Sequence, residues 1–344
     1  PHCSATRRDA TRSNKMNKTI GYGLLLALAL AAPFVVYPVF MMKLLCFVLF
    51  ACAFNLLLGY TGLLSFGHAA FLGGAGYITG WVMTRVIPDP VIGILAGTAF
   101  ATLIGVIMGY IAIRRQGIYF AMITLALAQM FFFIALQAKF TGGEDVPQGV
   151  RGGRLAGTLD LRHDFVMYYV VLAIVVAAFL LIYRTVHSPY GQILTAIKEN
   201  EPRTISLGYD VDRFKLLAFT LSAALAGLAG ATKTVVLGFA TLTDVHWSMS
   251  GLVILMTLIG GMGTLLGPVV GATIVVILEN RLGNIGHFLA SLTGVNWFNS
   301  LGEQVNLVIG FIFVVCVMLF RRGIVGEYIA LVQRLKLASV GKKR

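Results

Sequence analysis

The sequence predicts an all-α polytopic integral membrane protein with about ten transmembrane helices (about eight to ten) and with both termini on the cytoplasmic side. Hydrophobic residues make up 58% of the 344 positions and charged residues only 12%, which excludes a water-soluble globular domain. The apolar residues also gather in runs long enough to cross a bilayer. The 39 glycines predict closely packed helices, because small residues let membrane helices approach one another.

The N-terminal region holds the first expected helix. Residues 1–15 carry no apolar pattern and are expected to be a non-native or disordered leader outside the fold. From Met16 the chain resembles a secretory signal, with a charged start followed by an apolar core. The apolar character continues past Pro33 to Leu58, however, which favours a retained first span and a tight turn at Pro38 into a second.

The positions of the spans follow from bilayer thickness, because a helix that crosses the hydrocarbon core needs about 20 apolar residues. Two of the spans, 249–263 and 266–281, are short and rich in glycine, and we expect them to be tilted, broken or re-entrant. All spans belong to one transmembrane domain at 16–326, and a basic cytoplasmic tail follows at 327–344. The full set is 19–37, 39–58, 68–86, 91–113, 118–138, 166–184, 214–236, 249–263, 266–281 and 304–320.

The distribution of charge supports this count. Lys and Arg cluster before the first span, at Arg114 and Arg115, in a polar loop at 184–213, and in the tail. Ten crossings place all four clusters on one side, which is the cytoplasmic side because basic loops are retained there. The loop at 139–165, nearly balanced in charge, then lies on the periplasmic side. The net charge of +13 therefore reflects topology and does not indicate nucleic-acid binding.

Two glycine-rich stretches resemble nucleotide-binding loops but lack what such loops require. GLAGATKT at 227–234 has Thr232 where a phosphate-binding loop needs glycine. GGMGTLLG at 260–267 has neither a preceding β-strand nor a following acidic partner, so it indicates helix packing. The cysteines and histidines are scattered without metal-ligand spacing. We therefore expect no metal site, no cofactor and no catalytic site in this chain.

A polar interruption between two apolar runs marks a candidate translocation path. In NLLLGYTGLLSFGHAAF, from Asn55 onward, glycines alternate with hydroxyl groups and a histidine. One interpretation is a glycine-packed helix-turn-helix whose hydroxyls bond to the backbone. The other is a broken helix that lines a solute route, since irregular backbone at membrane depth is tolerated only beside a cavity or inside protein. The candidate residues are Asn55, Thr61, Gly62, Ser65, Gly67 and His68, together with Thr124 and Gln129 in the span at 118–138, which are also suited to interhelical hydrogen bonds.

The polar loop at 184–213 is the most specific feature of the chain. Its residues 188–191 read Ser-Pro-Tyr-Gly, which is typical of a turn. Residues 192–207 then have the pattern of an amphipathic helix, which Pro202 should split into two short helices and Gly208 should end. A solvated loop without a partner is the simpler interpretation. An apolar stripe beside clustered charges favours a docking element for another protein.

The order of these motifs resembles one known family. GYTGLLSFGHAAF, RRQGIYFAMITLALAQ, SPYGQILTAIKENE, LGYDVDRFKLLAFTLSAALAGLAGA, GGMGTLLGPVVGA and FRRGIVG together are similar to the LivM type of permease from branched-chain amino-acid ABC importers. The resemblance covers residues 16–326. It implies a bacterial inner-membrane subunit that pairs with a second related permease, two cytoplasmic ABC ATPases and a periplasmic solute-binding protein.

The resemblance also implies a role for the polar loop as the ATPase contact. Glu199, Asn200, Glu201 and Gly208 stand at matching positions, whereas residues 202–204 depart from the family's usual run of small residues. ATP would be used by the partner subunits, since this chain has no phosphate-binding loop. The candidate coupling residues are Tyr190, Gly191, Glu199, Asn200, Glu201, Arg203 and Gly208.

The expected function is passage of leucine, isoleucine or valine from the binding protein across the inner membrane. Urea or a short-chain amide is an alternative solute for a permease of the same type. A passive channel is an alternative of a different class, but it leaves the polar loop unexplained. A membrane-embedded enzyme is disfavoured, because the sequence offers no paired acid and base and no nucleophile beside a base.

Overall fold

The computed structural model describes residues 29–34, 36–137, 154–155, 159–160 and 163–293, with a few positions between 310 and 331. Over this part of the chain the predicted all-α class is confirmed, apart from one antiparallel pair of two-residue strands, β1 and β2. The elements are η1 (Ala32–Phe34), α2 (Pro38–Thr61), α3 (His68–Arg85), α4 (Pro90–Ala112), α5 (Ile118–Gln137), β1 (Arg154–Leu155), β2 (Leu159–Asp160), α6 (Asp164–Val186), α7 (Pro189–Glu199), α8 (Glu201–Ser206), α9 (Val211–Leu237), α10 (Leu242–Val245), α11 (Trp247–Gly260) and α12 (Gly267–Thr293).

Five of the described helices, α2, α4, α5, α6 and α9, are long and apolar enough to span a membrane, so the chain is a multi-pass membrane protein. Each coincides with a predicted span to within a few residues. The predicted span at 68–86 corresponds to α3, which is a shorter and more polar helix enclosed by its neighbours. The predicted total of about ten spans, and the orientation of the termini, stay predictions.

The last described helices differ in length from the prediction. The expected span at 249–263 corresponds to α11, which has 14 residues. The expected span at 266–281 is too short, because α12 continues to Thr293. The polar residues 279–281 end the apolar run, but no proline follows to end the helix. The first and tenth predicted spans, at 19–37 and 304–320, lie largely outside the described residues, as do the leader, most of the loop at 139–165 and the tail.

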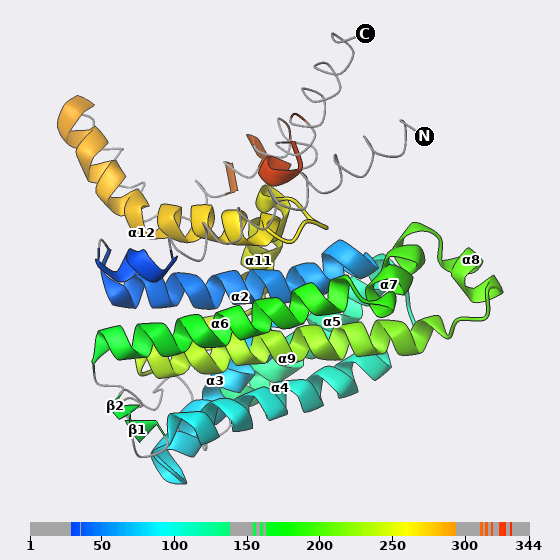
Figure 1. Cartoon of the computed structure of the whole chain (residues 1–344), viewed down its shortest axis with the longest axis horizontal. Helices are drawn as coiled ribbons and strands as arrows, with labels where there is room; N and C mark the ends of the chain where they lie inside the picture. The colour runs from blue at the N-terminus through cyan, green and yellow to red at the C-terminus, as the bar shows by residue number, and fades with distance from the viewer. Residues whose placement is uncertain are drawn as a thin grey trace, which may run out of the picture.

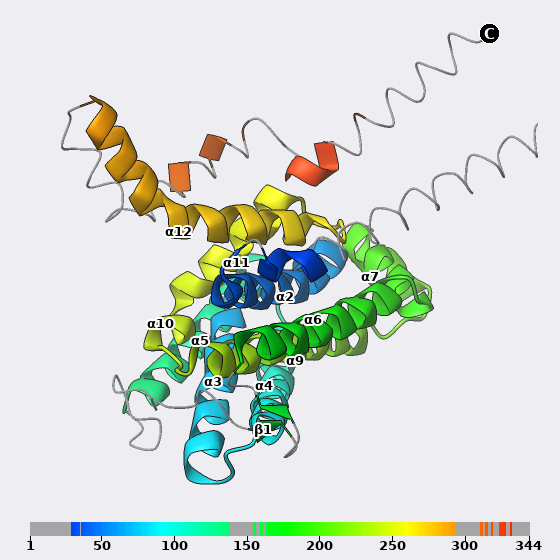
Figure 2. The ribbon, with the colours of Figure 1, turned by 60° about the vertical axis from the view of Figure 1, so that its left-hand side comes forward.

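The helices form a bundle with two distinct ends (Figure 1). Helices α2, α6 and α9 lie side by side, α4 packs along α9, and α12 crosses α2 on the opposite side from α4. Helices α7 and α8 lie at one end, which we call the α7–α8 end, and β1 and β2 lie at the other (Figure 1). Helix α9 is enclosed mainly by α2, α3 and α4, which Figure 2 shows from a second side. Accordingly, 78% of the apolar window of α2 and 61% of that of α9 are buried, against 28% for α4 and for α5.

Small residues set the spacing between these helices, as the glycine content predicts. On α4, Gly93, Gly97, Ala101, Gly105 and Gly109 recur every fourth residue, and all five are buried. A Cβ atom at Gly105 would lie 2.5 Å from Cβ of a residue on α9, and one at Gly97 would lie 2.5 Å from a main-chain oxygen of α3. The helices therefore touch backbone to backbone, which is how membrane helices gain packing energy without a hydrophobic driving force.

The closest approach between α9 and α3 yields a stability prediction. A Cβ atom on Gly230 would lie 1.9 Å from the carbonyl oxygen of Leu72. We expect Gly230→Ala to destabilise the protein by about 1–3 kcal/mol, because two helix backbones must separate to admit the methyl group. Gly251→Ala on α11 is the matched control, since a Cβ there meets nothing within 4 Å. Thermal unfolding in detergent measures both, and equal midpoints for the two variants would contradict this account of the α3–α9 contact.

Candidate functional site

The predicted interruption between two helices is confirmed at residues 62–67. Gly62 ends α2 with a φ of 75°, a left-handed conformation that favours glycine, and the chain runs without helix until His68 begins α3. We call residues 62–67 the linker. Its far end is fixed to two helices: the Phe66 N–H donates to Thr124 Oγ1 on α5 (3.2 Å), and Ser250 Oγ on α11 donates to the Phe66 carbonyl (2.7 Å).

His68 joins the linker to the centre of the bundle. Its Nε2 lies 2.8 Å from Ser222 Oγ on α9, and Ser222 Oγ donates to the Ala53 carbonyl on α2 (2.6 Å). Because Ser222 donates its only hydroxyl proton to the Ala53 carbonyl, His68 Nε2 is the donor to Ser222 Oγ and carries a proton. Nδ1 then has no hydrogen-bond partner among the described residues. Aromatic rings of Phe54 and Phe71 contact the imidazole edge to face.

Asn55 connects α2 to the turn between α11 and α12. The buried side chain donates from Nδ2 to the Thr264 carbonyl (2.9 Å) and accepts at Oδ1 from the Gly263 N–H (3.0 Å). This turn belongs to the GGMGTLLG segment, whose glycines let α11 and α12 pack closely: a Cβ on Gly260 would lie 1.8 Å from the Gly267 oxygen. The packing interpretation of that segment is therefore confirmed, and 227–234 likewise lies inside the continuous helix α9.

The eight candidates for a translocation path do not form one site. Thr61 donates to the Leu57 carbonyl within its own helix, and Ser65 Oγ accepts from the Gly67 N–H (3.1 Å). Thr124 Oγ1 accepts from the Phe66 N–H of the linker. Gln129 is half-buried further along α5. These hydroxyls bond to backbone, as the helix-turn-helix interpretation predicts. A role for these residues in translocation stays a prediction.

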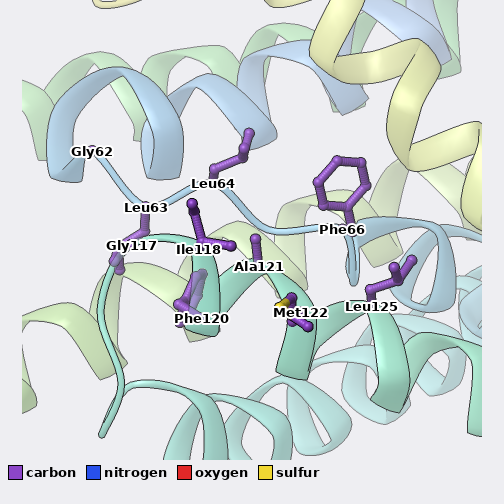
Figure 3. Close-up of a pocket in the computed structure, with 10 residues that line it drawn as sticks. All are labelled: Gly62, Leu63, Leu64, Phe66, Gly117, Ile118, Phe120, Ala121, Met122 and Leu125. Atoms are coloured by element: carbon purple, nitrogen blue, oxygen red, sulfur yellow. The ribbon is translucent and has the colours of Figure 1, made fainter.

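An apolar pocket lies between the linker and the start of α5 (Figure 3). Its volume is about 460 Å³, and its mouth is open to the surface. Of the eight candidate residues, Gly62 alone lines it. Figure 3 shows the linker beside the first turns of α5, with Ile118 and Ala121 of α5 pointing toward the linker. The lining residues are Gly62, Leu63, Leu64, Phe66, Gly117, Ile118, Phe120, Ala121, Met122 and Leu125.

The polar loop forms two helices, as predicted, but with different boundaries. The turn expected at 188–191 is instead the first turn of α7: Ser188 caps the helix by accepting from the Gly191 N–H (3.4 Å), and Pro189 occupies its first position. The break falls at Asn200, before Pro202, because Asn200 Oδ1 accepts from the Arg203 N–H (3.1 Å) and caps α8. Proline is tolerated in that first turn, where its missing N–H is not needed.

Three of the predicted coupling residues contact the helix bundle of this chain. Tyr190 stacks on Phe214 and donates its hydroxyl proton to the Phe214 carbonyl (3.0 Å); burial raises the pKa of this phenol, which stays a neutral donor. A Cβ on Gly191 would lie 2.2 Å from the carbonyl oxygen of Val186 at the end of α6. Glu201 Oε1 accepts from Lys215 Nζ on α9 (2.6 Å) and from the side-chain amide of Gln116 (2.8 Å).

The outer surface of the same element combines charge with exposed apolar side chains. Glu199, Asn200, Arg203 and Gly208 are exposed, and Gly208 has a φ of 88°. Ile205, Leu207 and Tyr209 are 55%, 68% and 43% exposed, and we call these three the outer patch. On α7, by contrast, the apolar positions Leu194 and Ile197 are buried against the bundle. The element is thus anchored on one side and free on the other.

Several residues with structural contacts at or near the site were not predicted from the sequence. Lys198 Nζ donates to the Gly59 carbonyl in the last turn of α2 (2.7 Å), and Gln116 and Lys215 both contact Glu201. Lys233 on α9 forms an ion pair with Asp244 on α10 (2.5 Å). A single lysine inside an apolar run is costly in a membrane, so Lys215 and Lys233 carried a usable signal. Nothing local distinguishes Lys198 from the exposed charges around it.

Comparison with known proteins places this chain in a family. The family model "Branched-chain amino acid transport system / permease component" matches residues 39–318. The chain is 27% identical over 281 residues to the high-affinity branched-chain amino acid transport system permease protein LivM of Escherichia coli (strain K12), a match that covers 72% of this chain and 64% of that relative.

Two further relatives extend the comparison. The LivM protein of Salmonella typhimurium is 25% identical over 307 residues, covering 78% of this chain and 70% of the relative. A probable permease protein LivH from Methanocaldococcus jannaschii is 30% identical over 149 residues, covering 42% of this chain and 43% of the relative. No solved structure matches the chain. The match spans slightly less than two thirds of the E. coli relative. Since the family model covers most of the sequence, the chain belongs to the family of permease components of branched-chain amino acid transport systems.

Proposed function

We propose that this chain is the membrane-spanning permease subunit of an ATP-driven ABC importer, which passes leucine, isoleucine and valine from a periplasmic binding protein across a bacterial inner membrane. The observation that carries this proposal is the α7–α8 element. Its inner side is held to the bundle by Tyr190, Lys198 and Glu201, while the apolar side chains of its outer patch are exposed. An exposed apolar patch with a charged rim is typical of a protein-protein contact.

The proposed partners follow from this arrangement and from the family. The outer patch docks a cytoplasmic ABC ATPase, which places the α7–α8 end in the cytoplasm and the β1–β2 end in the periplasm. ATP is then used by two ATPase subunits and not by this chain. A second permease related to LivM or LivH completes the membrane part, and the relatives named for each type support such a pair. Both termini of this chain lie in the cytoplasm.

Uptake into proteoliposomes tests the proposal. The permease is reconstituted with its partner permease, the ATPases and the binding protein. The proteoliposomes should transport labelled leucine toward the side that carries the ATPases when ATP is present on that side. Unlabelled valine should compete and urea should not. Competition by urea would favour the short-chain amide alternative, and leucine flux that is independent of both ATP and the ATPases would favour a passive channel.

The outer patch gives a sharper test of docking. We expect Leu207→Glu to abolish co-purification of the ATPase, because it puts a charge at the centre of an apolar contact. Ile87→Glu is the matched control: Ile87 is 41% exposed and follows α3, away from the α7–α8 end. Retention of the ATPase by the Leu207 variant, with wild-type uptake, would contradict the assignment of the outer patch.

A further inference from the structure

Two of the polar contacts that the α7–α8 element makes lead to opposite walls of the apolar pocket. Lys198 Nζ holds the Gly59 carbonyl (2.7 Å), and the chain then runs through Gly62 into the linker wall. Glu201 Oε1 holds the side chain of Gln116 (2.8 Å), and the chain then runs through Gly117 into the α5 wall. Lys198 and Glu201 flank the break at Asn200, so one short stretch of chain holds both walls.

The two walls of the pocket are joined directly at one end, and at the other end each wall contacts the α7–α8 element. At the joined end, the Phe66 N–H donates directly to Thr124 Oγ1 (3.2 Å), which joins the linker to α5. At the mouth, no described hydrogen bond joins residues 62–64 directly to residues 117–121. Both walls change direction there at a glycine in the left-handed region, with φ of 75° at Gly62 and 63° at Gly117. The walls can therefore pivot about Phe66 and Thr124, and the contacts to Lys198 and Glu201 set how far apart their mouths lie.

Glu201 is anchored to α9 as well as to Gln116, which affects how a movement of α8 is passed on. Its carboxylate also pairs with Lys215 Nζ on α9 (2.6 Å), and the Lys215 side chain is only 3% exposed. The buried Lys215 of α9 thus resists a shift of α8, whereas the exposed side chain of Gln116 can follow it. Lys198 likewise lies at the C-terminal end of α2, where unpaired carbonyls and the helix dipole favour a cation.

We propose that Lys198 and Gln116 are positioning residues that transmit movement of the α7–α8 element to the mouth of the apolar pocket, so that the pocket admits or releases a small solute with an aliphatic side chain. The identity of the solute and the source of the movement rest on the proposed function; the mechanical link itself does not. The pocket suits such a solute because its lining side chains are hydrocarbon apart from the thioether of Met122.

Distance measurements between spin labels test the link in the permease itself. Labels at Leu64→Cys and Met122→Cys, in a background without the four native cysteines, report the width of the mouth. Lys198→Met and Gln116→Leu each remove one contact, and in the Gln116 variant Glu201 keeps its pairing with Lys215. We expect a longer and broader distance distribution in both variants, with Lys198→Arg closer to wild type. Gln192→Ala, which changes an exposed residue of α7 outside the candidate coupling set, is the control. Unchanged distributions in both variants would overturn the inference, whatever the transport assays show.

Transport assays on the assembled complex then test the consequence. We expect both variants to retain the ATPase and its hydrolysis of ATP, but to lose roughly fivefold or more in solute taken up per ATP hydrolysed. A purely structural role would instead lower thermal stability and hydrolysis together. A wild-type ratio of uptake to hydrolysis would overturn the coupling role. Absence of ATP-dependent uptake in the wild-type complex would count against the proposed function, while the label distances would still decide the link.

Discussion

Replacing Lys233 with methionine is expected to lower the free energy of unfolding by about 3–5 kcal/mol, the largest loss among the substitutions considered. Lys233 Nζ lies 2.5 Å from Asp244 Oδ1, and both residues are 7% exposed. Nζ also lies 5.1 Å from the centroid of the Phe47 ring, a cation-π contact with α2. Removing the ammonium leaves a carboxylate buried without its counter-ion, which costs far more than the pair itself contributes.

The control for this prediction is the double variant Lys233→Met with Asp244→Leu. Because it removes both charges and replaces them with apolar groups of similar volume, we expect it to recover most of the lost stability. Denaturant unfolding in detergent, together with the yield of folded protein from membranes, measures all three chains. If the double variant were no more stable than the single variant, burial of an unpaired charge would not be the cause of the lost stability in Lys233→Met.

Gly191→Ala is expected to reduce ATP-driven uptake roughly fivefold or more, although Gly191 lies on the inner side of α7. A Cβ there would lie 2.2 Å from the Val186 oxygen and 2.7 Å from the Thr185 oxygen, so α7 must move away from the end of α6. That movement would also strain the hydrogen bond from Tyr190 to Phe214. Gly191 is thus expected to act by setting the position of the α7–α8 element, without direct contact with a partner.

Gln192→Ala is the control for the Gly191 prediction, because it changes the next residue of α7, which is exposed. Uptake of labelled leucine and co-purification of the ATPase should both fall in the Gly191 variant and stay near wild type in the control. Wild-type uptake by Gly191→Ala would show that α7 tolerates displacement. The close contact between α7 and α6 would then not be needed for uptake.

The spans were predictable from the sequence where length and apolar content decide the outcome. The predicted runs at 39–58 and 91–113 became α2 and α4, because burying unpaired backbone in lipid is prohibitive and an apolar run of that length must be helical. The end of α12 was not predictable in this way, since the polar residues 279–281 stop an apolar pattern without stopping a helix.

The contacts of the candidate site were less predictable, because they join distant parts of the chain. The charge and turn residues of the polar loop alone were enough to predict a docking element, and that role stays a prediction. Which of its side chains face inward depends on where α2, α6 and α9 lie: Lys198 meets a carbonyl 139 positions away, and Glu201 meets Gln116 across 85. Sequence pattern specifies an amphipathic helix but not the partner of each face, so the inward contacts of Tyr190, Gly191 and Glu201 were not predictable, and their coupling role stays a prediction.

The burial of Asn55 has a consequence for assembly of the protein in the membrane. Helix α2 is made early, whereas the Gly263 and Thr264 groups that satisfy its amide follow 208 and 209 residues later. If α2 enters the bilayer as it is made, it must do so with an unsatisfied polar side chain, and its long apolar sequence offsets that cost. The hydrophobicity of α2 therefore serves insertion, since 78% of its apolar window is later enclosed by protein. Asn55 stays without its partners until α11 and α12 arrive, so closure of their turn over α2 is a late step of assembly.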